Sequence, residues 1–443
     1  MLHPQLKPRD LNVLVIGAGG REHMLASKLA ASPRVARVYC APGNAGTAQV
    51  ATNVPIDALD FDQLVAFAQA TGIDLTVVGP ADPTMAGITD RFRDAGLVVV
   101  GPTRHQAQLE GSKAFSKAFM RRHGIPTARS EVFTDAAAAL AHLDSAWGPD
   151  GLVIKMDGLA EVQSTLVTTD QAAAEALVRE ALEQHRYGEA GARLLIEERL
   201  IGPELSILAF IDGTACKPLP PAQDHKQLFD GGRGVNTEGM GAFVPVPIAD
   251  DALMAQLQRE VLEPTCRGMA AEGLSYPGLI FIGVLLTREG PKVLEYNCRF
   301  GDPETQATLP GLETDLVDVF EACLAGRLDA QDVRHDGLPC VCLVAADRAY
   351  PDGFAAGSAI DGLEWAAAVP GVAVIHALTE ESPDGPRSRG GRVLNVIGQG
   401  RDITAAREAA YQAMGHIRLA GEAPHFRNDV GLGGAAAPVA AIR

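Results

Sequence analysis

Two oxygen-bearing side chains close together are the first candidates for chemistry in this sequence. Glu295 and Asn297 lie two residues apart in a stretch that reads as a β-strand, so both side chains project to the same face. A carboxylate beside an amide oxygen suits Mg²⁺, which proteins hold jointly with the phosphates of a nucleotide. The polar run that follows, residues 299–306, favours a functional role over a plain charged strand end.

Lysines and carboxylates spaced along the middle of the chain form a second candidate set. Its members are Lys113, Lys155, Glu197, Glu198, Leu200 and Glu204. Lys155 ends an apolar strand-like run, where an ammonium group is costly to bury without an anionic partner. Each charged member by itself is typical of a solvated group at the edge of an element. In this order, however, the set resembles the nucleotide cleft between the two lobes of an ATP-grasp enzyme.

A glycine-rich turn near the N-terminus is a candidate anion site. Residues 17–21 (GAGGR) join a strand to a helix, where backbone N–H groups and the helix dipole attract a phosphate. The dinucleotide fingerprint requires glycine at the sixth position, which is Glu22 here, and an acidic residue after the second strand, where Cys40 and Ala41 stand. The turn therefore disfavours a nicotinamide or flavin cofactor, and a plain tight turn remains the alternative to a phosphate site.

Alternating strands and helices position this turn. Continuous apolar runs at 11–16, 35–40, 75–78 and 97–100 read as strands, and 21–31, 61–70 and 83–95 read as helices. This alternation predicts a parallel sheet with helices on both faces, whose ligands lie at the carboxyl ends of the strands. The turn at 17–21 and a second loop at 41–46 (APGNAG) occupy such ends.

The rest of the chain reads as further α/β units. Strands are expected at 131–133, 152–155, 194–198, 205–211, 279–287 and 292–296, with helices at 111–124, from 171 onward and near 251–271. Gly290-Pro291 is expected to form the turn between the last two strands. We therefore predict an α/β multidomain protein with a parallel-sheet N-terminal domain, a two-lobed ATP-grasp core and a small α+β C-terminal domain. The expected boundaries are 1–105 for the N-terminal domain, 106–128 with 199–332 for the core, 129–198 for the lid, 333–430 for the C-terminal domain and 431–443 for a disordered tail.

Composition excludes several classes of protein. The 443 residues carry 38 Lys and Arg against 55 Asp and Glu, a net charge of −17 without a basic run, which argues against binding nucleic acid or an anionic membrane. Seven scattered cysteines without a C-x-x-C pair argue against a disulfide framework or a zinc site. No apolar run approaches the roughly 18 residues of a membrane span. We expect a cytoplasmic enzyme, a monomer or dimer, acting on small molecules.

Several long motifs carry a resemblance to one family. They are VIGAGGREH (15–23), APGNAGTA (41–48), VVGP (77–80), QLEGSKAF (108–115), QDHK (223–226), NCRFGDPETQ (297–306) and GGRVL (390–394). Through them the chain, from Val13 to about Asp429, resembles the phosphoribosylamine–glycine ligases (glycinamide ribonucleotide synthetases) of the ATP-grasp superfamily. That family joins the glycine carboxylate to the amine of 5-phosphoribosylamine through an acyl phosphate, using ATP and Mg²⁺.

The resemblance also implies roles for particular residues. Lys113 and Lys155 are expected at the ATP phosphates, the segment from Glu197 and Glu198 to Leu200 at adenine, and Glu204 at the ribose. Glu295 and Asn297 are expected to bind Mg²⁺. The expected sugar-phosphate residues are Gly17, Gly19, Gly20, Arg21, Gly43, Asn44, Gly46 and Thr47. The other expected substrate and catalytic residues are Asp224, His225, Lys226, Asn236, Glu238, Gly239, Arg299, Asp302 and Arg392.

The chain departs from the family pattern at three places. The lid segment K-x-D-G-L-A-A-G-K-G-V reads KMDGLAEVQST at 155–165, so the glycine-rich flap over the ATP phosphates is lost and Glu161 adds a negative charge. Glu238 replaces a glycine of G-P-N-T-G-G-M-G at 234–241, and PLPPAQ at 218–223 lacks the usual hydroxyl residues.

Three hypotheses follow from these departures. The chain is an ordinary ligase with a tolerated flap, a paralogue with an altered carboxylate or amine partner, or a non-catalytic or ATP-independent protein that keeps the sugar-phosphate site. In the second case Glu238 would bind an extra amino group of the new partner. Retention of Lys113, Glu204, Glu295 and Asn297 argues against the third.

Overall fold

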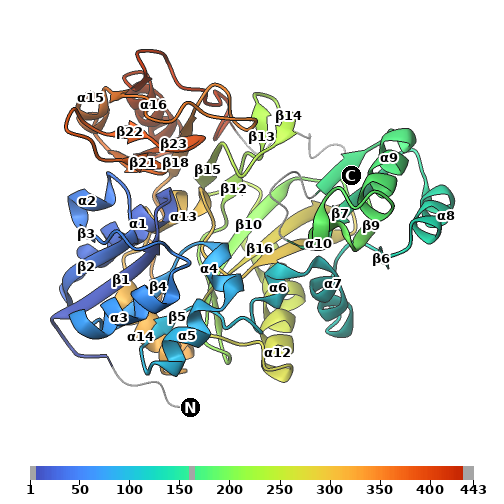
Figure 1. The fold of residues 1–443 in the computed structure, drawn as a ribbon, viewed down its shortest axis with the longest axis horizontal. Helices are drawn as coiled ribbons and strands as arrows, with labels where there is room; N and C mark the ends of the chain where they lie inside the picture. Colours follow the sequence, from blue (N-terminus) through green and yellow to red (C-terminus); the bar gives the residue numbers. More distant parts are fainter. Residues whose placement is uncertain (1–5, 159–164, 433–443) are drawn as a thin grey trace.

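The N-terminal unit is built on a parallel five-stranded sheet. The computed structural model describes residues 6–158 and 165–432, and Figure 1 shows this unit and the C-terminal block on one side, the lid at the far end and the core between them. The strand order is β3-β2-β1-β4-β5, and every pairing is parallel, as predicted. The strands are β1 (Leu11–Gly17), β2 (Val35–Pro42), β3 (Thr52–Asn53), β4 (Leu75–Val78) and β5 (Val99–Val100).

Helices cover both faces of this sheet because its strands are apolar on both sides. They are α1 (Gly20–Ala30), α2 (Thr47–Val50), α3 (Phe61–Thr71), α4 (Ala81–Ala86) and α5 (Ile88–Asp94). The single helix expected at 83–95 is wrong, because Gly87, at φ +94°, ends α4 and separates it from α5.

The lid is an antiparallel sheet with its own apolar core. Its strands β6 (Ser130–Phe133), β7 (Leu152–Met156), β8 (Thr165–Thr168) and β9 (Leu194–Glu198) lie in the order β6-β9-β7-β8. Helices α8 (Ala136–Ala146) and α9 (Gln171–Leu182) pack on it, and α10 (Gly188–Gly191) follows. The cluster that joins them includes Leu143, Ile154, Val178 and Ile196.

A second antiparallel sheet forms the core of the molecule. Strands β10 (Glu204–Ile211), β11 (Cys216–Pro218), β16 (Gly278–Thr287) and β17 (Gly290–Asn297) lie in the order β11-β10-β16-β17. The expected turn at Gly290-Pro291 is wrong, since both residues pair within β17 and the turn is at 288–289.

The helices of the core come from chain segments before, between and after the strands of this sheet. They are α6 (Gln108–Gly111), α7 (Lys113–Arg122), α11 (Asp251–Leu257), α12 (Glu263–Ala271), α13 (Glu304–Thr308) and α14 (Leu316–Leu324), with short 3₁₀ turns η2 (Leu309–Gly311) and η3 (Leu328–Ala330). The helix expected near 251–271 forms, but η1 (Gln258–Leu262) is a π-helical turn in its middle.

The C-terminal block shares a sheet with the core segment. Its order is β12-β15-β18-β23-β20, formed by β12 (Gln223–Asp224), β15 (Gly241–Val244), β18 (Cys340–Ala346), β23 (Arg392–Gln399) and β20 (Val372–His376). Two strands of the expected core, β12 and β15, therefore belong to this sheet. The domain boundaries given above remain predictions.

Smaller elements complete this block. Helix α16 (Ile403–Met414) packs on the sheet, near α15 (Leu363–Ala367). Three two-stranded ribbons are β13 (Gln227–Phe229) with β14 (Arg233–Asn236), β19 (Ile360–Asp361) with β24 (Arg418–Leu419), and β21 (Thr379–Glu380) with β22 (Arg387–Ser388). One apolar cluster runs from the core into this block, and another joins the N-terminal unit to the core. The N-terminal unit, the core and the C-terminal block are therefore packed together.

Candidate active site

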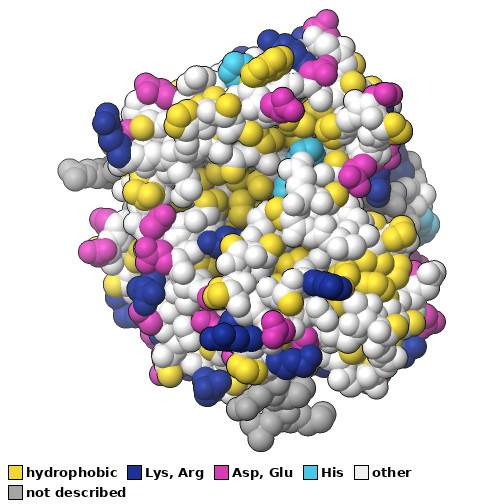
Figure 2. Space-filling view, turned by 90° about the vertical axis from the view of Figure 1, so that its left-hand side faces the viewer, with side chains coloured by type: hydrophobic (Ala, Val, Ile, Leu, Met, Phe, Trp, Pro, Cys, Tyr) yellow, Lys and Arg dark blue, Asp and Glu magenta, His cyan; other side chains and the backbone are white. Residues whose placement is uncertain are grey.

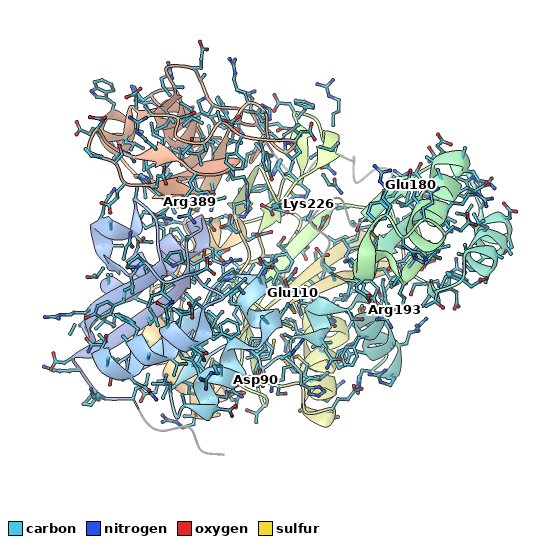
Figure 3. The ribbon with its side chains drawn as sticks, in the orientation of Figure 1. Asp90, Glu110, Glu180, Arg193, Lys226 and Arg389 are labelled. Atoms are coloured by element: carbon cyan, nitrogen blue, oxygen red, sulfur yellow. The ribbon has the colours of Figure 1, made fainter. Side chains whose placement is uncertain are left out.

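An ammonium group surrounded by carboxylates lies in the middle of the molecule. Lys226 follows β12, where the core, the C-terminal block and the lid face one another (Figure 3). Its Nζ forms ion pairs with Glu204 and, at 3.7 Å, with Oε1 of Glu295. Between these two carboxylates lies Gly283 of β16, where an added Cβ would be 3.4 Å from Glu295 and 3.8 Å from Glu204.

Burial and charge set the protonation of this cluster. Burial alone would lower the pKa of Lys226, but Glu204, Asp224 and Glu295 raise it well above its usual value. Burial raises the pKa of Asp224 well above its ordinary range, Lys226 opposes that shift, and Glu304 and other carboxylates add to it. Burial would also raise the pKa of Glu295, but Lys226 and neighbouring cations lower it overall. The neighbouring cations therefore favour the ionised form of Glu295, whereas burial makes the carboxylate of Asp224 a stronger base.

Two lysines from different lobes approach Glu295. Lys113 begins α7, donates from Nζ to the carbonyl of Gly158 at 3.2 Å, and faces both Glu295 and Lys155. Burial lowers the pKa of Lys113, Lys155 lowers it further, and Glu295 opposes both effects. The sequence-predicted phosphate lysines and the predicted metal carboxylate thus come together from α7, β7 and β17.

A third lysine, Lys117, shares a carboxylate partner with Lys155. Lys117 is fully buried and its Nζ lies 3.1 Å from Oε2 of Glu197 and 2.8 Å from Oγ1 of Thr127. The same Oε2 lies 3.2 Å from Nζ of Lys155. Lys117 was not among the predicted site residues, although its spacing of four from Lys113 puts both on one helix face. Among the described residues, Oε1 of buried Glu197 has no hydrogen-bond partner, which is uncommon for a buried carboxylate oxygen.

Strand alternation separates the two predicted adenine carboxylates. Glu197 points inward from β9, whereas the carboxylate of Glu198 accepts from the backbone N–H and from Nε of exposed Arg129 at 2.8 and 2.7 Å. Leu200 lies half-buried in the link between β9 and β10.

The predicted metal ligands fit Mg²⁺. Asn297 ends β17 two residues after Glu295, and its Oδ1 accepts from Arg299 at 3.3 Å. Within the described ranges, no group of three His, Cys, Asp or Glu side chains forms a metal cage. One carboxylate with one amide oxygen is what Mg²⁺ requires when phosphates and waters complete its octahedron. Glu110, which sequence reasoning missed, orients this segment by accepting from Arg299 Nε at 3.1 Å and from the backbone N–H of Cys298 at 2.7 Å.

Asp302 joins three parts of the chain. Its Oδ2 accepts from the backbone N–H of Arg21 at 2.9 Å, and its Oδ1 lies 3.2 Å from Arg392. Burial would raise the pKa of Asp302, but Arg392 and Arg21 lower it overall, so the carboxylate is charged. Arg392 also donates to the carbonyls of Glu238 and Gly239 at 3.1 and 3.3 Å.

The carboxylate of Glu238 is held by this same arginine. Its Oε2 lies 3.3 Å from Arg392, and its side chain is 77% exposed. The next residue, Gly239, has φ +112°, and an added Cβ would lie 2.6 Å from Pro303. The backbone of the loop is therefore restricted at Gly239, whereas the Glu238 side chain extends into solvent.

The first glycine loop is already occupied by carboxylates of the chain. Gly19 donates its N–H to Oε2 of Glu22 at 2.6 Å, and Arg21 pairs through Nε with Oε1 of Glu22 at 2.5 Å. An added Cβ on Gly20 would clash with Asn395 and lie 2.6 Å from Gln306, while Gly17 has φ +124°. This packing explains the glycines without a ligand, and the phosphate role of this loop remains a prediction.

The second loop is organised by one amide side chain. Oδ1 of Asn44 accepts from the backbone N–H groups of Gly46 and Thr47 at 2.8 and 2.9 Å, and its Nδ2 donates to the carbonyl of Ala377 at 2.9 Å. Gly43 has φ +74°, which a residue with a side chain rarely adopts. The loop therefore fastens the N-terminal unit to the C-terminal block.

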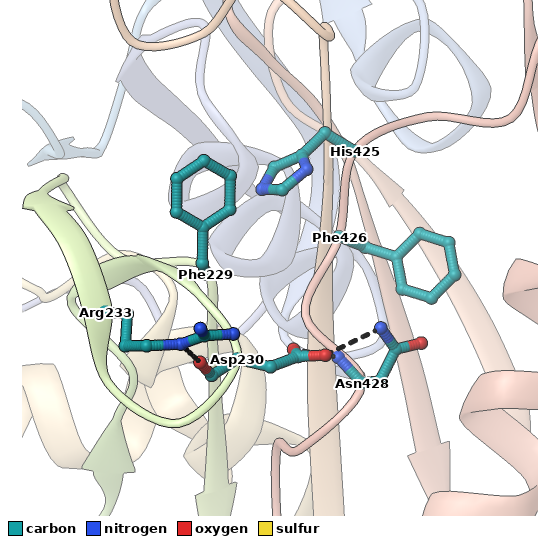
Figure 4. A pocket seen from close by; sticks show the side chains of 6 residues that line it. All are labelled: Phe229, Asp230, Arg233, His425, Phe426 and Asn428. Atoms are coloured by element: carbon teal, nitrogen blue, oxygen red, sulfur yellow. Dashed lines mark hydrogen bonds between the residues drawn. The ribbon is translucent and has the colours of Figure 1, made fainter.

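Two predicted substrate residues lie toward the β13–β14 ribbon. His225 is half-buried against Phe243, and burial lowers its pKa to about 4. Asn236 is exposed on β14 and accepts from Gln227 at 3.2 Å. The same ribbon lines a separate cavity of about 440 Å³, where Phe229 faces His425 (Figure 4).

The altered flap lies almost entirely outside the described residues. Of the segment 155–165, the structure describes residues 155–158 and Thr165, whereas Glu161, Val162 and Gln163 lie in the range 159–164 outside the described residues. The expected tail at 431–443 is likewise described only at its first two residues.

Comparisons with known proteins cover nearly the whole chain. Models of the N domain, the ATP-grasp (A) domain and the C domain of phosphoribosylglycinamide synthetase match residues 11–110, 111–305 and 340–433. A phosphoribosylamine–glycine ligase from Allochromatium vinosum is 46% identical over 413 residues, which are 92% of this chain and 95% of that protein. The chain belongs to the phosphoribosylamine–glycine ligase family. It is therefore an ATP-dependent ligase that forms a C–N bond between a carboxylate and an amine, with ATP and Mg²⁺ as its cofactors, as predicted.

Solved structures agree with this assignment. The crystal structure of a phosphoribosylamine–glycine ligase from Thermotoga maritima has a TM-score of 0.81 and 29% identity, covering 95% of this chain and 100% of that one. The biotin carboxylase domain of 2-oxoglutarate carboxylase from Hydrogenobacter thermophilus, solved with ADP and magnesium, shares the fold at a TM-score of 0.69 and 16% identity over 94% and 91% of the two chains. The predicted fold class is confirmed. Neither the altered-partner nor the non-catalytic hypothesis gains support from these comparisons.

On the face shown in Figure 2, basic and acidic side chains are interspersed. Among the helices that the structure describes, none has the length and apolarity to cross a membrane.

Proposed function

We propose that this chain joins the carboxylate of glycine to the amine of 5-phosphoribosylamine. The carboxylate oxygen attacks the γ-phosphorus of ATP and ADP leaves, and the amine then attacks the acyl carbon and phosphate leaves. The observation that carries this proposal is that Lys113 donates from Nζ to the carbonyl of Gly158 at 3.2 Å, three residues beyond Lys155, whose Nζ lies 3.2 Å from Oε2 of Glu197. Phosphoryl transfer needs concentrated positive charge at the transferring group, and these two ammonium groups supply it from opposite lobes.

The nucleotide side of the site uses residues of the lid and core. Lys113 and Lys155 bind the phosphates, and the free Oε1 of Glu197 accepts from the adenine amino group, with Leu200 beside the base. Glu204 binds the ribose. Glu198 forms an ion pair with Arg129 at the surface and so holds the end of β9 in place. Glu295 and Asn297 hold Mg²⁺, which when bound neutralises the phosphate oxygens.

The acceptor side uses the segments around Asp302. Arg299 places a cation beside the metal ligands, and its pKa is raised by Glu110 and other carboxylates although burial opposes this. Asp224, whose pKa burial raises, takes the proton that the attacking amine releases. His225, Lys226, Asn236, Glu238, Gly239 and Arg392 border the glycine site, and the loops with Gly17, Gly19, Gly20, Arg21, Gly43, Asn44, Gly46 and Thr47 border the sugar phosphate.

We further propose that the enzyme acts in the cytoplasm as a monomer or dimer, with the domain boundaries stated above. All seven cysteines are free, which suits a reducing compartment.

Two measurements test this function. Calorimetry with Mg-ATP is expected to show binding, and no binding at millimolar ATP would overturn the proposal. ADP release is then measured with phosphoribosylamine and a panel of amino acids. We expect turnover with glycine, and turnover with another amino acid but not glycine would overturn the substrate assignment.

A flap variant tests how this chain holds the phosphates. Glu161→Gly with Gln163→Lys restores the family residues, and it is expected to lower KM for ATP because one negative charge is lost and one positive charge gained. The single change Asp144→Asn in the lid helix α8 serves as the charge control. An unchanged KM would show that Lys113 and Lys155 hold the phosphates without this segment.

A further inference from the structure

One buried lysine of the site has no part in the reaction proposed above. Lys117, on α7, is 2% exposed, and the phosphates are assigned to Lys113 and Lys155 instead. An ammonium group is costly to bury unless it is paired and hydrogen-bonded. Burial lowers the pKa of Lys117 to about 8, and Glu197 opposes this effect. Lys117 is therefore mainly protonated at pH 7, and its buried charge calls for a role.

Two ammonium groups share one oxygen of a single buried carboxylate. Nζ of Lys117 lies 3.1 Å from Oε2 of Glu197, and Nζ of Lys155 lies 3.2 Å from the same oxygen. The Glu197 residue is 3% exposed, and within the described ranges its Oε1 has no hydrogen-bond partner. Two positive charges thus meet one negative charge, so the triad keeps an excess of positive charge. Such an excess in a buried place favours the approach of an anion such as a phosphate.

A threonine connects Lys117 to the strand of the predicted metal ligands. Nζ of Lys117 donates to Oγ1 of Thr127 at 2.8 Å, and this hydroxyl donates to the carbonyl of Val293 at 2.6 Å. Val293 lies in β17, two residues before Glu295, and its backbone N–H donates to the carbonyl of Pro126 at 2.7 Å. Thr127 belongs to the link between α7 and β6, where the chain passes from the core to the lid. The ammonium group is therefore anchored at this link as well as at the lid carboxylate.

Lys117 is the middle member of a row of cations on α7 that faces the lid. Lys113, Lys117 and Arg121 are spaced four residues apart, so they lie on one face of the helix. Lys113 donates to the carbonyl of Gly158 at 3.2 Å, and Arg121 donates to the carbonyl of Ser130 at 2.9 Å. These two acceptors are uncharged. Lys117 meets a carboxylate, so it can act on the charge of the site as well as on the fit of the lobes.

We propose that Lys117, anchored by Thr127, is a positioning residue for Lys155 in the ligase reaction. This role rests on the function proposed above, because it requires Lys155 to bind the phosphates of ATP. Lys117 holds Oε2 of Glu197 and takes a share of its negative charge. Lys155 is then only partly compensated, and it keeps its charge for a phosphate oxygen. Lys117 itself touches no substrate and acts through Glu197.

Lys117→Met tests this role, since methionine keeps most of the length of lysine and removes its charge. Glu197 then pairs with Lys155 alone, and the two charges compensate each other. We expect the Kd for Mg-ATP, measured by calorimetry on the full-length protein at pH 7, to rise about tenfold or more, because a hydrogen bond between charged groups is lost. The KM for glycine at saturating ATP is expected to stay unchanged. An equal rise in both constants would overturn the proposal, because it would indicate a general loosening of the protein.

Lys28→Met is the matched control for the loss of a lysine that is not freely exposed. Lys28 is half-buried, and its Nζ donates to the carbonyl of Leu312 at 2.6 Å, at the contact between the N-terminal unit and the core. We expect this variant to bind Mg-ATP as the unmodified protein does. A rise in Kd equal to that of Lys117→Met would contradict the inference, because any lost lysine contact would then suffice.

A double-mutant cycle separates this role from simple packing. In a Glu197→Gln background Lys155 has lost the charge that compensates it, so the addition of Lys117→Met is expected to have little further effect on the Kd. An equal loss of affinity in both backgrounds would overturn the proposal, since Lys117 would then act without Glu197. Thr127→Val removes the hydroxyl partner of Lys117, keeps the side-chain shape, and is expected to raise the Kd as well. An unchanged Kd in this variant would overturn the proposal even if Lys117→Met failed to fold.

Failure of this inference and failure of the proposed function give different results. Absence of Mg-ATP binding by the unmodified protein would overturn both. Binding by the unmodified protein that Lys117→Met leaves unchanged would overturn the role of Lys117 and leave the proposed function standing.

Discussion

Replacement of Glu238 by glycine tests what this departure from the family pattern does. Glu238→Gly removes a carboxylate that lies 3.3 Å from Arg392 and restores the residue that the family motif has at this position. The arginine keeps its ion pair with Oδ1 of Asp302 at 3.2 Å and its bonds to the carbonyls of residues 238, 239 and 302. Arg392 is therefore expected to stay in place.

The size of the effect follows from the exposure of the pair. The Glu238 side chain is 77% exposed, and such ion pairs contribute about 0.2–1 kcal/mol. The added backbone freedom of glycine costs about 0.5–1 kcal/mol more. We expect the free energy of unfolding to fall by about 1–2 kcal/mol. If the pair also affects the site by its full value, kcat/KM for glycine changes by at most about fivefold, since 1.4 kcal/mol corresponds to a factor of ten.

The assay is ADP release at varied glycine concentration, with urea unfolding measured on the same preparations. Glu422→Gly is the matched control, because Glu422 forms a comparably exposed ion pair with Arg348 at 3.4 Å. Both variants are expected to lose similar stability and to keep glycine turnover. A change of more than about tenfold in kcat/KM for glycine in Glu238→Gly alone would refute this reasoning, because the carboxylate would then act on the substrate.

Three further predictions concern the metal, a glycine and two histidines. Glu295→Gln is expected to lower kcat/KM by at least about a hundredfold, with partial recovery at high Mg²⁺ in an ADP-release assay, since one charged metal ligand is lost. Gly20→Ala is expected to reduce the free energy of urea unfolding by about 1–3 kcal/mol through its clash with Asn395, whereas Gly148→Ala, with no atom within 4 Å, is expected to be nearly neutral. Burial lowers the pKa of His23 to about 3 and that of His376 to about 4. The unfolded chain therefore binds more protons below pH 6.5 than the folded one. The contribution of these histidines to the free energy of unfolding is complete above pH 6.5 and falls as the pH drops toward 4. A His23→Gln, His376→Gln double variant with an equally steep dependence of stability on pH would contradict this assignment.

Local patterns predicted most of the elements of each unit and the common face of Glu295 and Asn297. Apolar runs such as β1 and β4 predicted a parallel sheet because strand burial is a local property of the chain. The two-residue spacing of Glu295 and Asn297 was enough to put both on one face, since alternation in a strand has a period of two. The family resemblance and its ligase activity were likewise evident from continuous motifs and were confirmed by the comparisons.

Contacts between distant segments were decided by the tertiary structure alone. In the sequence Lys117 reads as an ordinary helical lysine, and only the fold brings Glu197 of β9 to 3.1 Å from it. Glu110 likewise shows no partner in the sequence, and only the fold brings Arg299 to 3.1 Å from it. Glu238 was read as a candidate ligand for an amino group, but β23 places Arg392 against its carboxylate. Charge partners depend on three-dimensional proximity, whereas strand and helix formation depends mainly on neighbouring residues.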